Sequence, residues 1–150
     1  MKKDTQNSAR VGLLIDPAHD LLRPDNLPLD AVFKPKSVAL IGATDRVGSV
    51  GRMVLSNMIG SPFGGTIYPV NSKRDNVLGI HAYKNLQALP ERPDCIVVTT
   101  PSDSVPDLIR DAVGLGVPAA IVISAGFKEI GEKGMEYERQ IKETIRAKCA

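Results

Sequence analysis

The chain has 150 residues, of which 43% are hydrophobic and 24% are charged, and its formal net charge is +2. This is the composition of one soluble globular domain, and the net charge is too small to indicate nucleic-acid binding. No apolar run approaches the ~20 residues of a membrane-spanning helix, and the N-terminus lacks the apolar core of a secretion signal. We therefore expect a cytoplasmic protein with no nucleic-acid or membrane partner. Its two histidines and two cysteines show no ligand spacing, so no metal site is predicted.

The first 32 residues differ from the remainder of the chain. Val11–Ile15 has a strand-like pattern, but Pro17, Pro24 and Pro28 interrupt any regular element that follows it. The sequence therefore predicts an irregular N-terminal arm over residues 1–32 and a nucleotide-binding domain over residues 33–150.

Apolar runs alternate with helical patterns from Phe33 onward. The runs are apolar throughout, which is typical of parallel strands covered on both faces. The sequence thus predicts an α/β fold, a Rossmann-type doubly wound parallel sheet with helices on both faces and the first strand central. Because no strand follows the final helix, we expect the sheet to lack its last strand and the domain to be C-terminally incomplete. The expected strands are residues 37–43, 66–70, 95–99 and 119–124, and the expected helices are 48–60, 104–115 and 131–148.

A glycine-rich turn, GATDRVGSVG, joins the first strand to the first helix. In this fold such a turn binds a phosphate group at the helix N-terminus. The dinucleotide fingerprint G-x-G-x-x-G is only half present, because Arg46 stands where its first glycine belongs. A side chain at Gly48 or Gly51 is expected to block the phosphate while the domain still folds. The alternative is a turn that only packs the helix on the strand. The candidate phosphate-binding residues are Gly42, Thr44, Gly48, Ser49 and Gly51.

The ends of the other strands complete the predicted site. Asn71 stands where an NAD-binding domain carries an acidic residue, and Lys73 and Arg74 follow it. Two cations suit a ribose phosphate, which is the 2′-phosphate of NADP or the 3′-phosphate of coenzyme A. The third and fourth strands end in small residues that leave room for a slender arm such as pantetheine, namely Thr100, Pro101, Ser124, Ala125 and Gly126. No catalytic constellation accompanies them, so no catalytic residue is predicted.

The segment FKPKSVALIGA, residues 33–43, resembles the opening of the CoA-binding domain of succinyl-CoA synthetase alpha subunits and, more closely, of ADP-forming acetyl-CoA synthetases. The likeness continues through GSVG, YPVN, VLG and VISAGFKE, over about residues 30–150 in the same order. The resemblance implies the N-terminal CoA-binding module of an NDP-forming acyl-CoA synthetase, a ligase for acyl-CoA + ADP + phosphate ⇌ acid + CoA + ATP. It implies that the CoA phosphates contact Thr44, Gly48, Ser49 and Gly51, the 3′-phosphate faces Lys73, and pantetheine contacts Ser124, Ala125 and Gly126.

The resemblance also implies partners that this chain does not contain. Coenzyme A or acyl-CoA is the small-molecule ligand, whereas ATP, ADP and magnesium bind only through further synthetase domains or a second subunit. The family's phosphohistidine lies in a later domain, and neither His19 nor His81 matches it. The segment Thr100-Pro101-Ser102 departs mildly from the family's V-P-A. Two alternatives stay open: the CoA-binding module of a bifunctional synthetase-like protein N-acetyltransferase, and an NADP-binding oxidoreductase domain.

Overall fold

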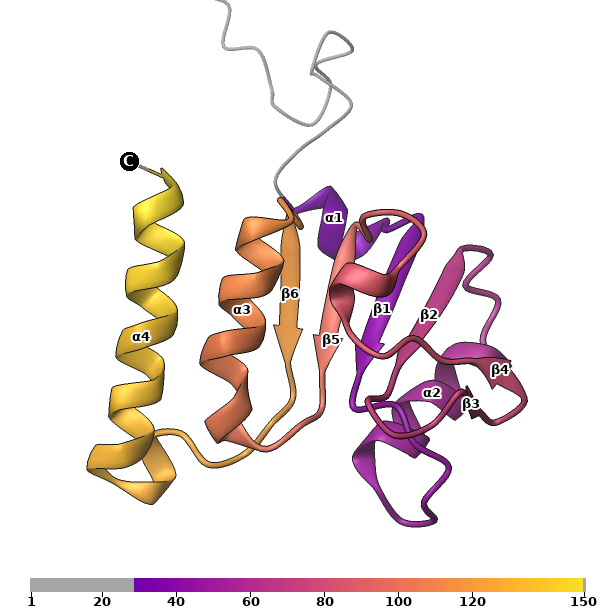
Figure 1. Ribbon diagram of the computed structural model, residues 1–150, viewed down its shortest axis with the longest axis horizontal. Coiled ribbons are helices and arrows are strands. Elements are labelled where there is room, and N and C mark those ends of the chain that lie inside the picture. The colour runs from indigo at the N-terminus through magenta and orange to yellow at the C-terminus, as the bar shows by residue number, and fades with distance from the viewer. Residues whose placement is uncertain (1–28, 150) are drawn as a thin grey trace, which may run out of the picture.

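A computed structural model of the chain describes residues 29–149, so the predicted arm, with Val11–Ile15, lies almost entirely outside the described residues. Four parallel strands form one sheet in the order β2-β1-β5-β6 (Figure 1). The first strand lies between two neighbours, as predicted. The strands are β1 (Ser37–Ile41), β2 (Thr66–Val70), β5 (Cys95–Val98) and β6 (Ala119–Val122).

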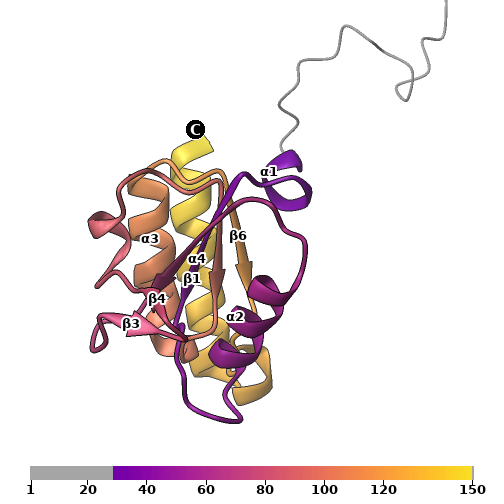
Figure 2. The ribbon, with the colours of Figure 1, turned by 90° about the vertical axis from the view of Figure 1, so that its right-hand side faces the viewer.

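Helices cover both faces of the sheet, which confirms the predicted Rossmann-type α/β fold. The helix α2 (Val50–Gly60) links β1 to β2 on one face, while α3 (Val105–Gly114) links β5 to β6 on the other, where α4 (Glu132–Cys149) packs beside it (Figure 2). Within residues 29–149, no helix is long and apolar enough to cross a membrane. Elements that the sequence did not predict are α1 (Asp30–Phe33), the hairpin of β3 (Asn76–Val77) and β4 (Ile80–His81), and 3-10 turns at Leu86–Ala88, Ser102–Ser104 and Lys128–Ile130.

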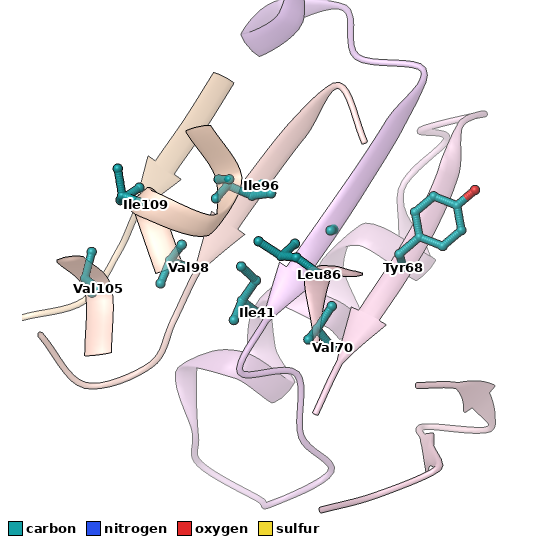
Figure 3. Close-up of a cluster of buried hydrophobic side chains, with 10 residues drawn as sticks. Ile41, Tyr68, Val70, Leu86, Ile96, Val98, Val105 and Ile109 are labelled. Carbon is teal, nitrogen blue, oxygen red and sulfur yellow. The ribbon is translucent and has the colours of Figure 1, made fainter. Parts of the chain in front are cut away.

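The central strands are apolar at every position because each face of the sheet has its own core. In β1, Leu40 packs with Leu55 of α2 on one face, while Ile41 packs with Val105 and Ile109 of α3 on the other (Figure 3). All five side chains are buried. Burial of a side chain of this size contributes about 1.5–3 kcal/mol, so the two cores fix the helices on opposite faces.

The strand β6 departs from the prediction of a strand buried on both faces. It forms one border of the sheet, and the exposed fractions of Ile121 and Val122 are 38% and 37%. The other border, at β2, is covered: Tyr83 N–H donates to Pro69 O over 2.9 Å, and Asn71 N–H donates to Tyr83 O over 2.8 Å. Within residues 29–149, β6 is therefore apolar in sequence without being buried.

Three of the four predicted strands are one or two residues too long at their carboxyl ends, and β2 has the predicted bounds. β1 ends at Ile41 because Gly42 has a φ of +90°, which turns the backbone out of the strand. β5 and β6 end at Val98 and Val122, before the small residues of the predicted site. The candidate residues therefore lie beyond the strand ends, on turns or, for Gly51, in the first turn of α2.

Candidate functional site

A cleft of about 490 Å³ opens at the carboxyl end of the sheet, where β1, β2 and β5 stop. Ligands of open α/β sheets bind at this end of the strands. Apolar side chains line part of the cleft, and they come from two strands, α3 and the turn that follows the β3–β4 hairpin: Ile41, Val70, Leu86 and Leu108. The combination of an apolar wall with polar groups suits a ligand that carries a flat ring and charged substituents.

The cleft contains four of the twelve predicted site residues. They come from three different strand ends and are Gly42, Asn71, Lys73 and Thr100. The other eight lie outside the lining of the cleft. Four of them belong to the glycine-rich turn, namely Thr44, Gly48, Ser49 and Gly51, and four follow β5 and β6, namely Pro101, Ser124, Ala125 and Gly126.

The glycines of the turn have different roles. A Cβ on Gly51 would lie 2.1 Å from the main-chain oxygen of Gly42, so the absence of a side chain lets α2 lie against the end of β1. The expectation that Gly51→Val blocks only the ligand is therefore wrong, because the substitution would also push the helix off the strand. Gly48 differs, since its φ is +79° and no atom lies within 4 Å of its Cβ position. The expectation for Gly48 stays a prediction.

Hydroxyl groups hold the turn in shape. Ser49 is the N-cap of α2: its Oγ accepts a hydrogen bond from Arg52 N–H over 3.3 Å and donates to Arg46 O over 2.7 Å. Thr44 Oγ1 accepts from Arg46 N–H over 3.3 Å. Both hydroxyls are engaged with the backbone of the turn, which presents the N-terminus of α2 at the carboxyl end of the sheet.

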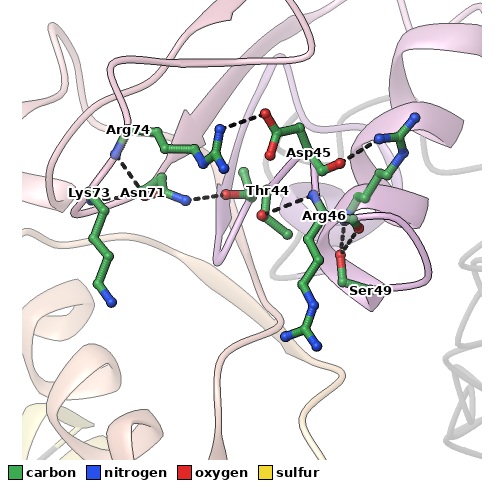
Figure 4. A network of polar contacts seen from close by, with 9 residues as sticks. Thr44, Asp45, Arg46, Ser49, Asn71, Lys73 and Arg74 are labelled. Carbon is green, nitrogen blue, oxygen red and sulfur yellow. Dashed lines mark hydrogen bonds and ion pairs between the residues drawn. The ribbon is translucent and has the colours of Figure 1, made fainter.

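Asn71 fastens the end of β2 to the glycine-rich turn. Its side-chain N–H donates to Ala43 O over 2.8 Å, and its Oδ1 accepts from the backbone N–H groups of Lys73 and Arg74 over 2.8 and 2.9 Å (Figure 4). Asn71 thus fixes the backbone from which both cationic side chains extend. The guanidinium of Arg74 pairs with Asp45 over 2.7 Å, whereas the ammonium group of Lys73 has no partner among residues 29–149.

The ends of β5 and β6 are joined by hydroxyl groups. Ser104 Oγ lies 2.8 Å from Thr100 Oγ1, and the hydroxyl of Ser124 donates to Thr100 O. Beyond β6, the backbone N–H of Gly126 donates to the carboxylate of Glu129 over 2.5 Å. Backbone hydrogen bonds, with that of Gly126 the largest, lower the pKa of Glu129. These contacts place the turn after β6 next to the end of β5.

Several cleft residues were missed by the sequence reasoning. Ser104, Asp107, Leu108 and Asp111 line the cleft from the end of the 3-10 turn and from α3. Their spacing of three, four and seven residues puts them on one helical face, and this signal was present in the sequence. Lys84 and Asn85 had no comparable signal, because the β3–β4 hairpin that carries them to the cleft was not predicted. Lys84 pairs with Asp75 over 2.7 Å and thereby lowers the pKa of that carboxyl.

Comparison with known proteins identifies the family. The family described as "CoA binding domain" matches residues 36–149. The chain is 43% identical over 119 residues to a trans-feruloyl-CoA synthase from an unknown prokaryotic organism, a match covering 79% of this chain and 17% of that protein. It is 38% identical over 112 residues to acetate–CoA ligase (ADP-forming) II of Archaeoglobus fulgidus, covering 75% of this chain and 17% of that protein.

Solved structures agree in fold and sequence. The crystal structure of PH0766 from Pyrococcus horikoshii matches with a TM-score of 0.74 and 33% identity, covering 80% of this chain and 27% of that one. The dinucleotide-forming acetyl-coenzyme A synthetase 1 of Ca. Korarchaeum cryptofilum, in complex with phosphate and ADP, matches with a TM-score of 0.72 and 30% identity, covering 80% of this chain and 25% of that one. The chain thus spans between about a sixth and a quarter of the length of these relatives. It belongs to the CoA binding domain family and is homologous to the N-terminal part of ADP-forming acyl-CoA synthetases.

Proposed function

We propose that this chain binds coenzyme A at the carboxyl end of its sheet, as the CoA-binding module of an ADP-forming acyl-CoA synthetase. The observation that carries the proposal is the unpaired ammonium group of Lys73 at a cleft that also contains the end of β1. An unpaired cation beside an apolar wall suits the 3′-phosphate and adenine of coenzyme A. Asp107 and Asp111, which the sequence analysis did not identify as site residues, supply hydrogen-bond acceptors for the ribose or the base.

The order of the strand ends suggests where the remaining parts of coenzyme A would bind. The diphosphate would lie at the glycine-rich turn and the N-terminus of α2, where backbone N–H groups and the helix dipole favour negative charge. The pantetheine arm would then run toward Ser124, Ala125 and Gly126 after β6. In this proposal ATP, ADP and magnesium are bound by other domains or by a second subunit, and the acyl transfer takes place with their participation.

Calorimetric titration of the chain with coenzyme A, dephospho-CoA and NADP tests the proposal. We expect coenzyme A to bind about tenfold more tightly than dephospho-CoA. A charge-assisted hydrogen bond contributes about 1.5–3 kcal/mol, and the lower end of this range applies because Lys73 is exposed. Lys73→Gln should remove this preference. Lys36→Gln is the matched control, since Lys36 is an exposed lysine that precedes β1 at the opposite end of the sheet. Equal affinities for the two CoA forms, or tighter binding of NADP, would refute the assignment.

A further inference from the structure

The positive charges around the glycine-rich turn are not equally available to a ligand. Arg74 pairs with the Asp45 carboxylate over 2.7 Å, and the guanidinium of Arg52 donates to the main-chain oxygen of Asp45. Figure 4 shows Lys73 and Arg46 extending away from this network, with no contact drawn at the end of either side chain. Of two adjacent cations at the end of β2, one is therefore free and the other is neutralised by a carboxylate from the turn.

Asp45 contributes a carboxylate to the glycine-rich turn itself. It lies in the turn that precedes the N-terminus of α2, where backbone N–H groups and the helix dipole favour anions of the ligand. A carboxylate there opposes the approach of a phosphate, and it also occupies Arg74. The side chains of Arg74 and Asp45 keep exposed fractions of 53% and 36%, so the pair is accessible to solvent and weak. Its removal should release the arginine at little cost to the fold.

We propose that Asp45 is a positioning residue that limits the strength and selectivity of CoA binding by holding Arg74 away from the ribose phosphate. This inference rests on the proposed CoA site. Without Asp45, Arg74 would stand beside Lys73 as a second free cation, while its backbone remains fixed by the hydrogen bond to Asn71 Oδ1. The guanidinium could then bind the 3′-phosphate with two parallel hydrogen bonds, which an ammonium group cannot do.

The test compares two single substitutions that break the same ion pair. Asp45→Asn frees the arginine, and we expect it to bind coenzyme A about two- to fivefold more tightly than the wild type, the range for release of an exposed ion pair. Arg74→Gln breaks the pair without freeing a cation, so its affinity should stay near that of the wild type or fall. If the ion pair had a purely structural role, both substitutions would change the affinity for coenzyme A in the same direction.

Two further measurements complete the experiment. The gain of Asp45→Asn should be larger with coenzyme A than with dephospho-CoA, and this difference between the two ligands should disappear in the double variant Asp45→Asn, Arg74→Gln. Thermal unfolding followed by circular dichroism establishes that each variant is folded. An Asp45→Asn variant that is folded but binds coenzyme A no more tightly than the wild type would overturn the inference. If the wild type shows no preference for coenzyme A over dephospho-CoA, the proposed site itself fails, so the two failures are distinguishable.

Discussion

The contact between Gly51 and Gly42 predicts that even one added methyl group in α2 destabilises the domain. In Gly51→Ala the new Cβ would lie 2.1 Å from a backbone oxygen, whereas ordinary van der Waals contact begins at 3.4 Å, so α2 must move by about 1.3 Å. Overpacking of this kind costs up to about 3 kcal/mol, and the higher helix propensity of alanine returns about 1 kcal/mol. We expect the free energy of unfolding to fall by about 2 kcal/mol.

Gly60→Ala is the control, because Gly60 is the last residue of the same helix and no atom lies within 4 Å of its Cβ position. It should leave stability unchanged or raise it by up to about 1 kcal/mol. Urea unfolding followed by circular dichroism measures the free energy of unfolding of both variants. In thermal unfolding, the melting temperature of Gly51→Ala should fall by about 4–8 °C. A Gly51→Ala protein as stable as the wild type would show that the helix can move off β1 freely and that the close contact with Gly42 O does not limit stability.

Three further substitutions or titrations test other contacts. Ser49→Ala removes the N-cap of α2 and should lower the free energy of unfolding by about 1 kcal/mol in urea titrations; no change would mean that the cap is dispensable. The hydrogen bond to Glu91 raises the pKa of Tyr68 from 10.0 to about 12, so its stabilisation is complete below pH 10 and lost as the pH rises through 12. Stability measured against pH should lose this dependence in Tyr68→Phe, and an unchanged profile would contradict the assignment. Burial raises the pKa of the Cys95 thiol to about 11, and the Asp94 carboxylate adds a smaller effect. In a Cys149→Ser variant, Cys95 should therefore react with a disulfide reagent at pH 8 only after the protein unfolds. Fast reaction of the folded variant would count against the burial of Cys95.

The fold could be predicted from the sequence because its strong signals are local. Each central strand is a short apolar run, and each helix begins or ends near glycine, serine or proline, so the element order and the parallel sheet followed directly. The exposure of β6 could not be predicted in this way. Ile121 and Val122 have the composition of a buried strand, and only the position of β6 at the border of the sheet leaves them exposed.

The candidate site could be predicted in position but not in detail. Gly42, Asn71, Lys73 and Thr100 line the cleft, as follows from the rule that strand ends gather at one end of a parallel sheet. The partners of the side chains do not follow from it. Lys73 and Arg74 are neighbours in sequence and look equivalent, yet the carboxylate that separates their roles belongs to Asp45, 29 residues earlier. Likewise, glycine spacing alone cannot distinguish a glycine that makes room for a ligand from Gly51, whose missing side chain lets α2 pack against the end of β1.

The two borders of the sheet differ in how readily a further strand could pair with them. At β2, Pro69 has no N–H to offer, and its oxygen and the N–H of Asn71 are already bonded to Tyr83, so a further strand finds few free groups there. At β6, no strand within residues 29–149 pairs with the outer border, and the side chains beside it are aliphatic. A β-segment that extends this sheet, whether from the same polypeptide or another, therefore finds more free backbone groups next to β6 than next to β2. The sheet would widen beside the turn that carries Ser124, Ala125 and Gly126, whereas the cleft residues that follow β1 and β2 lie farther from that border.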